Sequence, residues 1–312
     1  MKALRNLWVV SPFLHAPWAR LGAERKGGPL KLDRIVVAVD NSSASRDAAS
    51  CAARIAMVSG AELTALAVAP GAGASAGSRM SPLDLIEAAL GREPFAEFPG
   101  LSFEVAGVHG LPQVEIGRYA EHRKADLIVL GRKQRTRSTR LFLGDTADAV
   151  IRRSRIPCLL VPPGQVTFSH LTAALDGTDR GFSVYDQAAG FARACAMKLD
   201  AVSVEPKWTG EPAALSGQVW SARTEKLAAM INSRTPRGRS APQGSGSCAT
   251  DDRLHVRNGE AVEEIVSVIA EVGTDVLALG FHRGGPPLVV STGSVSRKLV
   301  HAAPCAVLSV PF

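Results

Sequence analysis

The sequence has few of the residue groupings that build metal and redox sites. Its 312 residues include five cysteines and seven histidines, but no C-x-x-C pair and no H-E-x-x-H string occurs among them. We therefore expect no metal site and no redox dithiol. An odd number of scattered cysteines is also typical of a protein kept in a reducing compartment, which predicts a cytoplasmic location.

Long apolar runs and aromatic residues are scarce as well. No run approaches the roughly 20 apolar residues that span a bilayer, so we predict no membrane span. Aromatic residues make up only 5% of the chain, and they do not alternate with basic residues as they do in surfaces that stack nucleic-acid bases. The formal net charge of +7 therefore favours anionic ligands or partners in general, and nucleic acid is not the partner we expect.

The most informative feature that the sequence does contain is an internal repeat. Asp40 in the first half matches Asp176 in the second within an ungapped alignment. Three blocks share order and spacing: residues 34–70 with 170–206, residues 109–131 with 258–280, and residues 156–161 with 303–308. A repeat of this length indicates two domains of the same architecture.

Each half alternates short apolar runs with longer stretches of helical period, a pattern typical of βαβ units and a mostly parallel sheet. The first helix is predicted to begin after Ser42 or Ser43, and another at Pro112, where the missing N–H is harmless. Strands are predicted near residues 33–40, 62–69, 101–107, 126–131 and 157–162. We therefore predict an α/β fold of two tandem, doubly wound, five-stranded parallel-sheet domains, Rossmann-like, over residues 33–163 and 169–312.

Three segments do not fit the strand and helix pattern. Residues 71–81 and 233–252 are rich in Gly, Ser, Pro and Ala, and both are predicted to be flexible surface loops at the same place in the repeat. Residues 1–32 are predicted to be a mobile tail or the product of a start codon placed too early. The alternative is a peptide that binds a membrane surface or a partner.

Candidate ligand residues lie where the strands of an open parallel sheet end, because ligands bind at the carboxyl ends of such strands. Asp40 and Asp176 follow the first strand of each half. Gly131 and Gly280 end the fourth strand, and a second glycine, Gly144 or Gly293, opens a helix thirteen residues later. Glycines allow the backbone to approach a phosphate closely, and a helix N-terminus attracts its negative charge.

The strand pattern, the aspartate after the first strand and this glycine loop resemble the universal stress protein family, and the resemblance covers nearly all of residues 34–312. It implies a loop of the form G-x-x-G, nine residues, then G followed by Ser or Thr, which wraps the ribose and phosphates of ATP. It also implies that the aspartate lies beside the adenosine, and that domains pair through their last strands. The ligand implied is ATP or another adenine nucleotide, with or without bound Mg²⁺.

Both loops depart from that pattern. In the first domain Gln134 replaces the second glycine and Asp145 replaces the Ser or Thr, and a carboxylate there repels a phosphate. In the second domain Arg283 replaces the second glycine, although two further glycines follow it directly. The resemblance therefore assigns the better nucleotide site to the second domain, at Asp176, Gly280, Arg283, Gly284, Gly285, Gly293, Ser294 and Val295, and a weaker one to Asp40, Gly131 and Gly144.

The first loop also carries a cluster of basic residues. Two interpretations are open: a clamp for phosphates, or a solvated basic loop partly balanced by Asp145, which we favour. The cluster consists of Arg132, Lys133, Arg135, Arg137 and Arg140.

These observations leave three hypotheses. The first is a stress-response protein that binds ATP, ADP or AMP and changes its contacts with unidentified protein partners. The second is an interaction scaffold that needs no nucleotide, and the third is a slow ATP hydrolase. A dedicated enzyme is disfavoured because neither H-x-G-H, S-G-G-x-D-S nor a nucleophile triad occurs in the sequence. We expect the last strands, CLLVPP and CAVLSVPF, to pair within one chain as a pseudo-dimer, which either is a finished unit or dimerises further.

Overall fold

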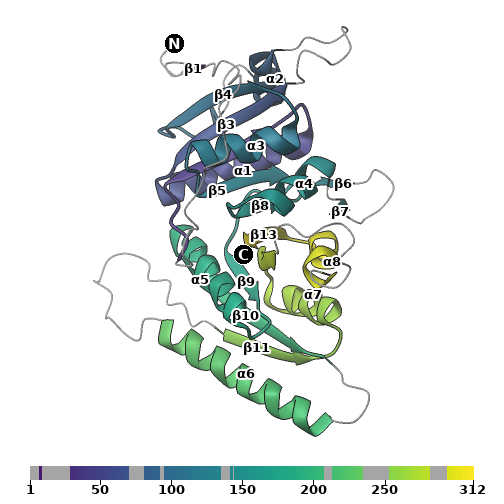
Figure 1. Cartoon of the computed structure of the whole chain (residues 1–312). Helices are drawn as coiled ribbons and strands as arrows, with labels where there is room; N and C mark the ends of the chain where they lie inside the picture. The colour runs from purple at the N-terminus through teal and green to yellow at the C-terminus, as the bar shows by residue number, and fades with distance from the viewer. Residues whose placement is uncertain are drawn as a thin grey trace, which may run out of the picture.

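The protein, described here from a computed structural model, is built on one continuous sheet of eleven strands (Figure 1). The strand order is β1-β4-β3-β2-β5-β8-β13-β12-β9-β10-β11. The structure describes residues 7–8, 29–69, 81–91, 95–134, 141–142, 144–206, 213–234, 253–281 and 294–312. Among these residues, no helix combines the length and the apolar character needed to cross a membrane.

The first domain contributes five parallel strands and four helices. Its strands are β2 (Arg34–Val39), β3 (Glu62–Ala69), β4 (Phe103–His109), β5 (Leu127–Gly131) and β8 (Cys158–Val161). Its helices are α1 (Ser43–Ser59), α2 (Pro82–Leu90), α3 (Pro112–His122) and α4 (Asp145–Arg153). All five strands lie within two residues of the predicted positions. The order β4-β3-β2-β5-β8 reverses between β2 and β5, so the carboxyl ends of these two strands form the crevice at which this fold binds ligands.

The helices begin where the sequence provides capping groups. Ser42 caps α1 by accepting a hydrogen bond from the backbone N–H of Ser45. Ser81 and Asp84 form a reciprocal capping box at the start of α2. Pro112 occupies the first position of α3, as its missing N–H predicts.

The second domain repeats this arrangement. Its strands are β9 (His170–Ala174), β10 (Lys198–Glu205), β11 (Arg253–Asn258), β12 (Val276–Phe281) and β13 (Ala306–Pro311). Its helices are α5 (Asp179–Ala194), α6 (Ala213–Arg234), α7 (Ala261–Val272) and α8 (Ser294–Ala302). In Figure 1, α5 lies on one side of the sheet and α7 and α8 lie on the other. The fold is therefore two tandem doubly wound domains, as predicted.

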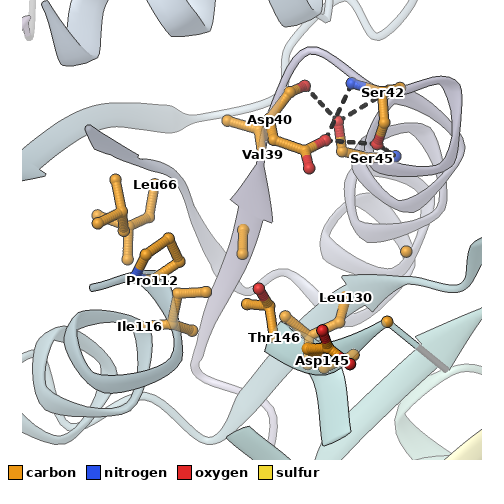
Figure 2. A pocket seen from close by; sticks show the side chains of 15 residues that line it. Val39, Asp40, Ser42, Ser45, Leu66, Pro112, Ile116, Leu130, Asp145 and Thr146 are labelled. Carbon is orange, nitrogen blue, oxygen red and sulfur yellow. Dashed lines mark hydrogen bonds between the residues drawn. The ribbon is translucent and has the colours of Figure 1, made fainter. Parts of the chain in front are cut away.

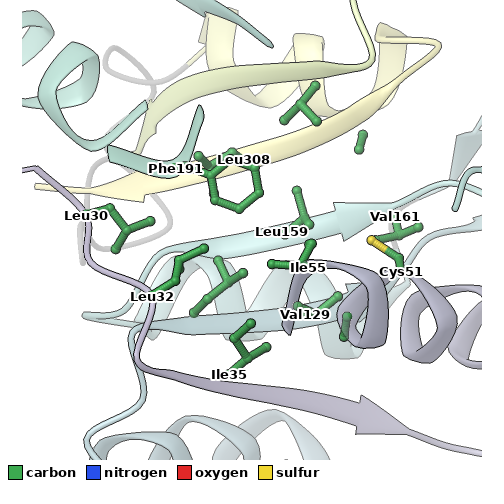
Figure 3. Close-up of a cluster of buried hydrophobic side chains, with 14 of the residues drawn as sticks. Leu30, Leu32, Ile35, Cys51, Ile55, Val129, Leu159, Val161, Phe191 and Leu308 are labelled. Carbon is green, nitrogen blue, oxygen red and sulfur yellow. The ribbon is translucent and has the colours of Figure 1, made fainter. Parts of the chain in front are cut away.

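The two domains join through their last strands. β13 pairs with β8 in antiparallel register, which places Leu308 opposite Leu159 and Val307 opposite Leu160. The hydrophobic cluster on one face of the sheet contains Leu159, Phe191 and Leu308 together (Figure 3). The cluster on the other face likewise combines residues of both domains. Each core therefore runs without a break across the domain boundary.

Part of the segment assigned to a mobile tail is instead packed into the fold. Leu30 and Leu32 are buried in the cluster shown in Figure 3. A Cβ placed on Gly190 of α5 would lie 2.3 Å from the backbone nitrogen of Leu30. The prediction is therefore wrong for residues 30–32, because these leucines bury apolar surface against the second domain. Further upstream, β1 (Leu7–Trp8) pairs in parallel with β4.

Candidate functional site

A cavity of about 300 Å³ lies at the carboxyl ends of the strands in the first domain (Figure 2). It sits at the crevice where the strand order reverses, and the N-termini of α1, α3 and α4 surround it. The lining residues are Ala38, Val39, Asp40, Ser42, Ser45, Leu66, Val68, Pro112, Ile116, Leu130, Gly131, Gly144, Asp145, Thr146 and Ala147. Three predicted residues of the first domain, Asp40, Gly131 and Gly144, thus meet around one cavity.

Asp40 is oriented by the start of α1. Its Oδ1 accepts a hydrogen bond of 2.9 Å from the backbone N–H of Ser42 and a short one from the Ser42 hydroxyl. The hydroxyl of Ser45 donates to the Asp40 carbonyl oxygen at 2.6 Å. These bonds hold the carboxylate at the rim of the cavity, beside the first turn of α1 (Figure 2).

The opposite wall is the N-terminus of α4, and it is acidic. Gly144 is the N-cap and has no side chain with which to cap the helix. Asp145 and Asp148 both lie in the first turn, and Asp145 lines the cavity. A carboxylate at this position is stabilised by the helix dipole and offsets the attraction that the helix end has for another anion.

The lining residues as a set are acidic and apolar. Among the lining residues that the structure describes, Asp40 and Asp145 are acidic and none is basic. The walls between them are apolar, formed by Leu66, Pro112 and Ile116 among others. This arrangement suits a ligand with an apolar body and hydrogen-bond donors at its polar end.

The two glycines of the first loop have different surroundings. A Cβ on Gly131 would lie 2.3 Å from the carbonyl oxygen of Ala44 in α1, whereas a Cβ on Gly144 would meet nothing within 4 Å. Gly131 therefore allows α1 to pack closely on β5. Its suggested role in approaching a phosphate stays a prediction.

The buried position of Arg132 contradicts both interpretations of the basic loop for this residue. Its side chain is fully buried and donates hydrogen bonds to the carbonyl oxygens of Cys305 at 2.9 Å and Ala303 at 3.2 Å. Burial lowers the pKa of this guanidinium to about 10. Arg132 is therefore neither a phosphate clamp nor a solvated surface residue, but a contact to the end of α8 in the second domain.

Of the rest of the basic cluster, the structure describes only the backbone of Lys133. Lys133 and Gln134 form the short strand β6, which pairs with β7 (Leu141–Phe142). Residues 135–140, which include Arg135, Arg137 and Arg140, lie outside the described residues.

In the second domain, Asp176 repeats the geometry of Asp40. Its Oδ1 accepts hydrogen bonds from the backbone N–H of Thr178 at 3.0 Å and from the Thr178 hydroxyl at 2.7 Å. Gly177 between them has a φ of +71°, and a Cβ there would lie 3.1 Å from the Cβ of Arg223 in α6. The two aspartates are thus held in the same way at the starts of α1 and α5.

Gly280 is surrounded differently from its counterpart Gly131. A Cβ on Gly280 would lie 2.3 Å from the ring of Phe312 and 3.0 Å from Val184. The guanidinium of Arg180 lies 5.5 Å from the centre of the Phe312 ring. The last residue of the chain thus fills the space beside β12 that helix α1 fills beside β5.

The structure describes the second loop only at its two ends. Residues 282–293, which include Arg283, Gly284, Gly285 and Gly293, lie outside the described residues. Beyond them, α8 begins at Ser294, its first turn has no acidic residue, and the hydroxyl of Ser296 donates to the Gly280 carbonyl oxygen at 2.9 Å. Val295 is 37% exposed at this helix end.

The four described cysteines, of which Cys195 is partly buried and the others are buried, are poor candidates for chemistry. Desolvation raises the pKa of the Cys158, Cys195 and Cys305 thiols to about 12 and that of Cys51 well above its ordinary value. Thiols in this state are weak nucleophiles. Within the described part of the chain, no group of three His, Cys, Asp or Glu residues is placed to hold a metal ion.

Two Rossmann-like domains in tandem, each with an aspartate after its first strand and a helix N-terminus at the crevice, define a class of doubly wound α/β proteins. The profile of the Universal stress protein family matches residues 31–162 and again residues 167–311. The chain belongs to this family and carries two copies of its domain.

Individual relatives agree with this assignment. A universal stress protein from Methanocaldococcus jannaschii is 33% identical over 137 residues, which are 41% of this chain and 81% of the relative. The crystal structure of a universal stress protein from Archaeoglobus fulgidus has a TM-score of 0.66 at 17% identity and covers 89% of this chain and 98% of its own. A Pseudomonas aeruginosa structure has a TM-score of 0.63 at 15% identity, over 90% and 93%. The two structures establish the shared two-domain fold.

Proposed function

We propose that this protein is a nucleotide-responsive binding module whose second domain holds one adenine nucleotide, ATP, ADP or AMP. The working units in this proposal are residues 33–163 and 169–312. Bound nucleotide would alter the contacts of the chain with protein partners in the cytoplasm. ATP or ADP would bring Mg²⁺ with it, bound to its phosphates as a counter-ion.

The observation that carries this proposal is the charge at the two corresponding helix N-termini. Helix α8 has no acidic residue in its first turn, whereas α4 begins with Asp145, whose side chain lines the first-domain cavity. A phosphate is stabilised by the free N–H groups and dipole of a helix end only where no carboxylate already occupies that position. The second domain therefore offers the better phosphate site.

Two further observations support the same assignment. Asp176 is held at the start of α5 in the way that Asp40 is held in the first domain, which supports the proposed position of the adenosine beside Asp176. Arg297 and Lys298 are exposed on α8 shortly after its N-terminus. Their positive charge favours an anionic ligand on this side of the domain.

The test is to denature the purified protein, identify any released nucleotide by mass spectrometry, and measure ATP and AMP binding by equilibrium dialysis. We expect close to one adenine nucleotide per chain. Gly293→Asp places a carboxylate at the N-terminus of α8 and should abolish this binding. Gly144→Asp, the matched change in the first domain, should leave it intact.

The rival hypotheses give different results in the same experiment. A protein that releases no nucleotide and binds neither ATP nor AMP is the interaction scaffold, and the proposal is then wrong. Sustained phosphate release from ATP, lost in Gly293→Asp, identifies the slow hydrolase.

A further inference from the structure

We infer that the cavity of the first domain binds an uncharged nucleoside, and that Asp145 keeps phosphorylated ligands out of it. The inference goes beyond the proposed function because it concerns the other domain and a different ligand class.

The size and the walls of the cavity fit a base with a sugar attached. Its volume of about 300 Å³ lies at the lower end of the range for small-molecule sites, roughly 300–1,000 Å³. The apolar side chains of Leu66, Val68, Pro112, Ile116 and Leu130 line it. Such walls bury the faces of a flat heteroaromatic ring.

The polar groups of the cavity select hydrogen-bond donors. The carboxylates of Asp40 and Asp145 accept hydrogen bonds and donate none. The hydroxyls of Ser42, Ser45 and Thr146 also line the cavity. The hydroxyl groups of a ribose and the amino group of a base supply the donors that these carboxylates require.

The charge of Asp145 excludes a phosphate on electrostatic grounds. A phosphate at the N-terminus of α4 would lie next to this carboxylate, and two like charges in contact repel each other more strongly near a protein surface than in water. None of the described lining residues is basic and able to offset this repulsion. A nucleoside without phosphate avoids the repulsion and still places its base between the apolar walls.

Two isoleucines at matching positions of the repeat allow each domain to be observed separately. Ile116 lines the first-domain cavity, and Ile265 occupies the corresponding position in α7 of the second domain. Both are buried in the same core cluster, where ligand binding nearby would shift their methyl NMR signals. The full chain, labelled at isoleucine methyl groups, is titrated in separate experiments with adenosine and with AMP.

We expect adenosine to shift the Ile116 signal, and AMP to shift it only at concentrations at least tenfold higher. An AMP response at Ile116 as strong as that of adenosine would overturn the inference, and so would adenosine that leaves Ile116 unchanged at millimolar concentration. The response of Ile265 to AMP tests the proposed function independently, so the failure of one is distinguishable from the failure of the other.

Substitution of the carboxylate provides the second arm of the experiment. Asp145→Ser should tighten AMP binding at Ile116 about tenfold, a change that corresponds to about 1.4 kcal/mol. Asp148→Asn removes the same charge from the same helix turn, at a residue that does not line the cavity, and should leave the AMP response within about twofold. Equal effects of the two variants would show that general helix charge, and not the cavity, controls the ligand.

Discussion

At the scale of single residues, identical glycines in a loop pattern have different physical reasons to be glycine. Gly131 and Gly144 are both positions of the glycine loop pattern that the family resemblance implies. Only at Gly131, however, does a backbone atom lie close to where a Cβ would be. The sequence indicates where close approach is needed, but not whether a ligand or a neighbouring helix makes the approach. That distinction requires the position of α1 relative to β5.

This difference predicts that the same substitution, glycine to alanine, lowers the free energy of unfolding by different amounts at the two positions. Gly131→Ala should lower the free energy of unfolding by about 1–3 kcal/mol, because the added methyl forces α1 away from β5. Gly144→Ala should lower it by no more than about 1 kcal/mol, because nothing lies within 4 Å of the new methyl and only the poorer capping of α4 by alanine remains. Urea denaturation followed by circular dichroism measures both. Equal effects would show that the packing of α1 does not determine the identity of residue 131.

The two aspartates, in contrast, were predictable from the sequence alone. Asp40 and Asp176 match in the ungapped alignment, and the structure gives them the same hydrogen bonds to the residue two positions later. Local geometry of this kind depends on neighbours in the sequence, so matching residues in the two halves adopt the same hydrogen bonds.

At the scale of elements, the strands were predictable because apolar runs and helical periods are local signals. The contact between the end of β5 and the end of α8 was not predictable from the sequence. Arg132 reaches carbonyl oxygens 171 and 173 residues away, and no local pattern marks such a pair. The repeat does not reveal it either, because Phe281 stands at the matching position of the second domain.

The first domain has a local hydrogen bond where the second domain depends on Arg132. There the carbonyl oxygen of Ile156, the counterpart of Ala303, accepts a hydrogen bond of 2.7 Å from the hydroxyl of Ser154. His301 stands at the position matching Ser154 in the second domain, at the end of α8. Arg132 supplies the donor from the other domain, so the wall of the first-domain cavity is linked to the helix that carries the proposed phosphate site.

Removal of this donor should therefore destabilise the protein. Arg132→Met keeps an apolar side chain of similar length but leaves the carbonyl oxygens of Ala303 and Cys305 without this donor, and we expect a loss of about 3 kcal/mol in the free energy of unfolding. Arg153→Met makes the same chemical change at an exposed position of α4 and should cost less than about 0.5 kcal/mol. Equilibrium denaturation compares the two variants. A loss in Arg132→Met no larger than in Arg153→Met would contradict the structural role of this side chain.

At the scale of the whole molecule, the repeat predicted two similar domains and the family resemblance predicted that their last strands pair, but neither predicted how completely the domains merge. β8 and β13 pair in antiparallel register, and the cores on both faces of the sheet include residues from both halves. Leu30 and Leu32 add apolar surface to one of these cores from a segment that lies outside the repeat. A pattern repeated within each half carries no information about a surface formed only between them.

Continuous cores predict that both domains unfold together. In a urea titration, the Ile116 and Ile265 methyl signals of the folded protein should disappear with the same midpoint, as in a single cooperative transition. Leu308→Asp buries an unpaired charge opposite Leu159 at the junction, where Leu308 is fully buried, and should separate the two midpoints, with Ile265 lost first. Val256→Asp places the same charge on an exposed position of β11 and should leave the midpoints coincident. Separate midpoints in the unmodified chain would mean that the β8–β13 junction does not couple the unfolding of the two domains.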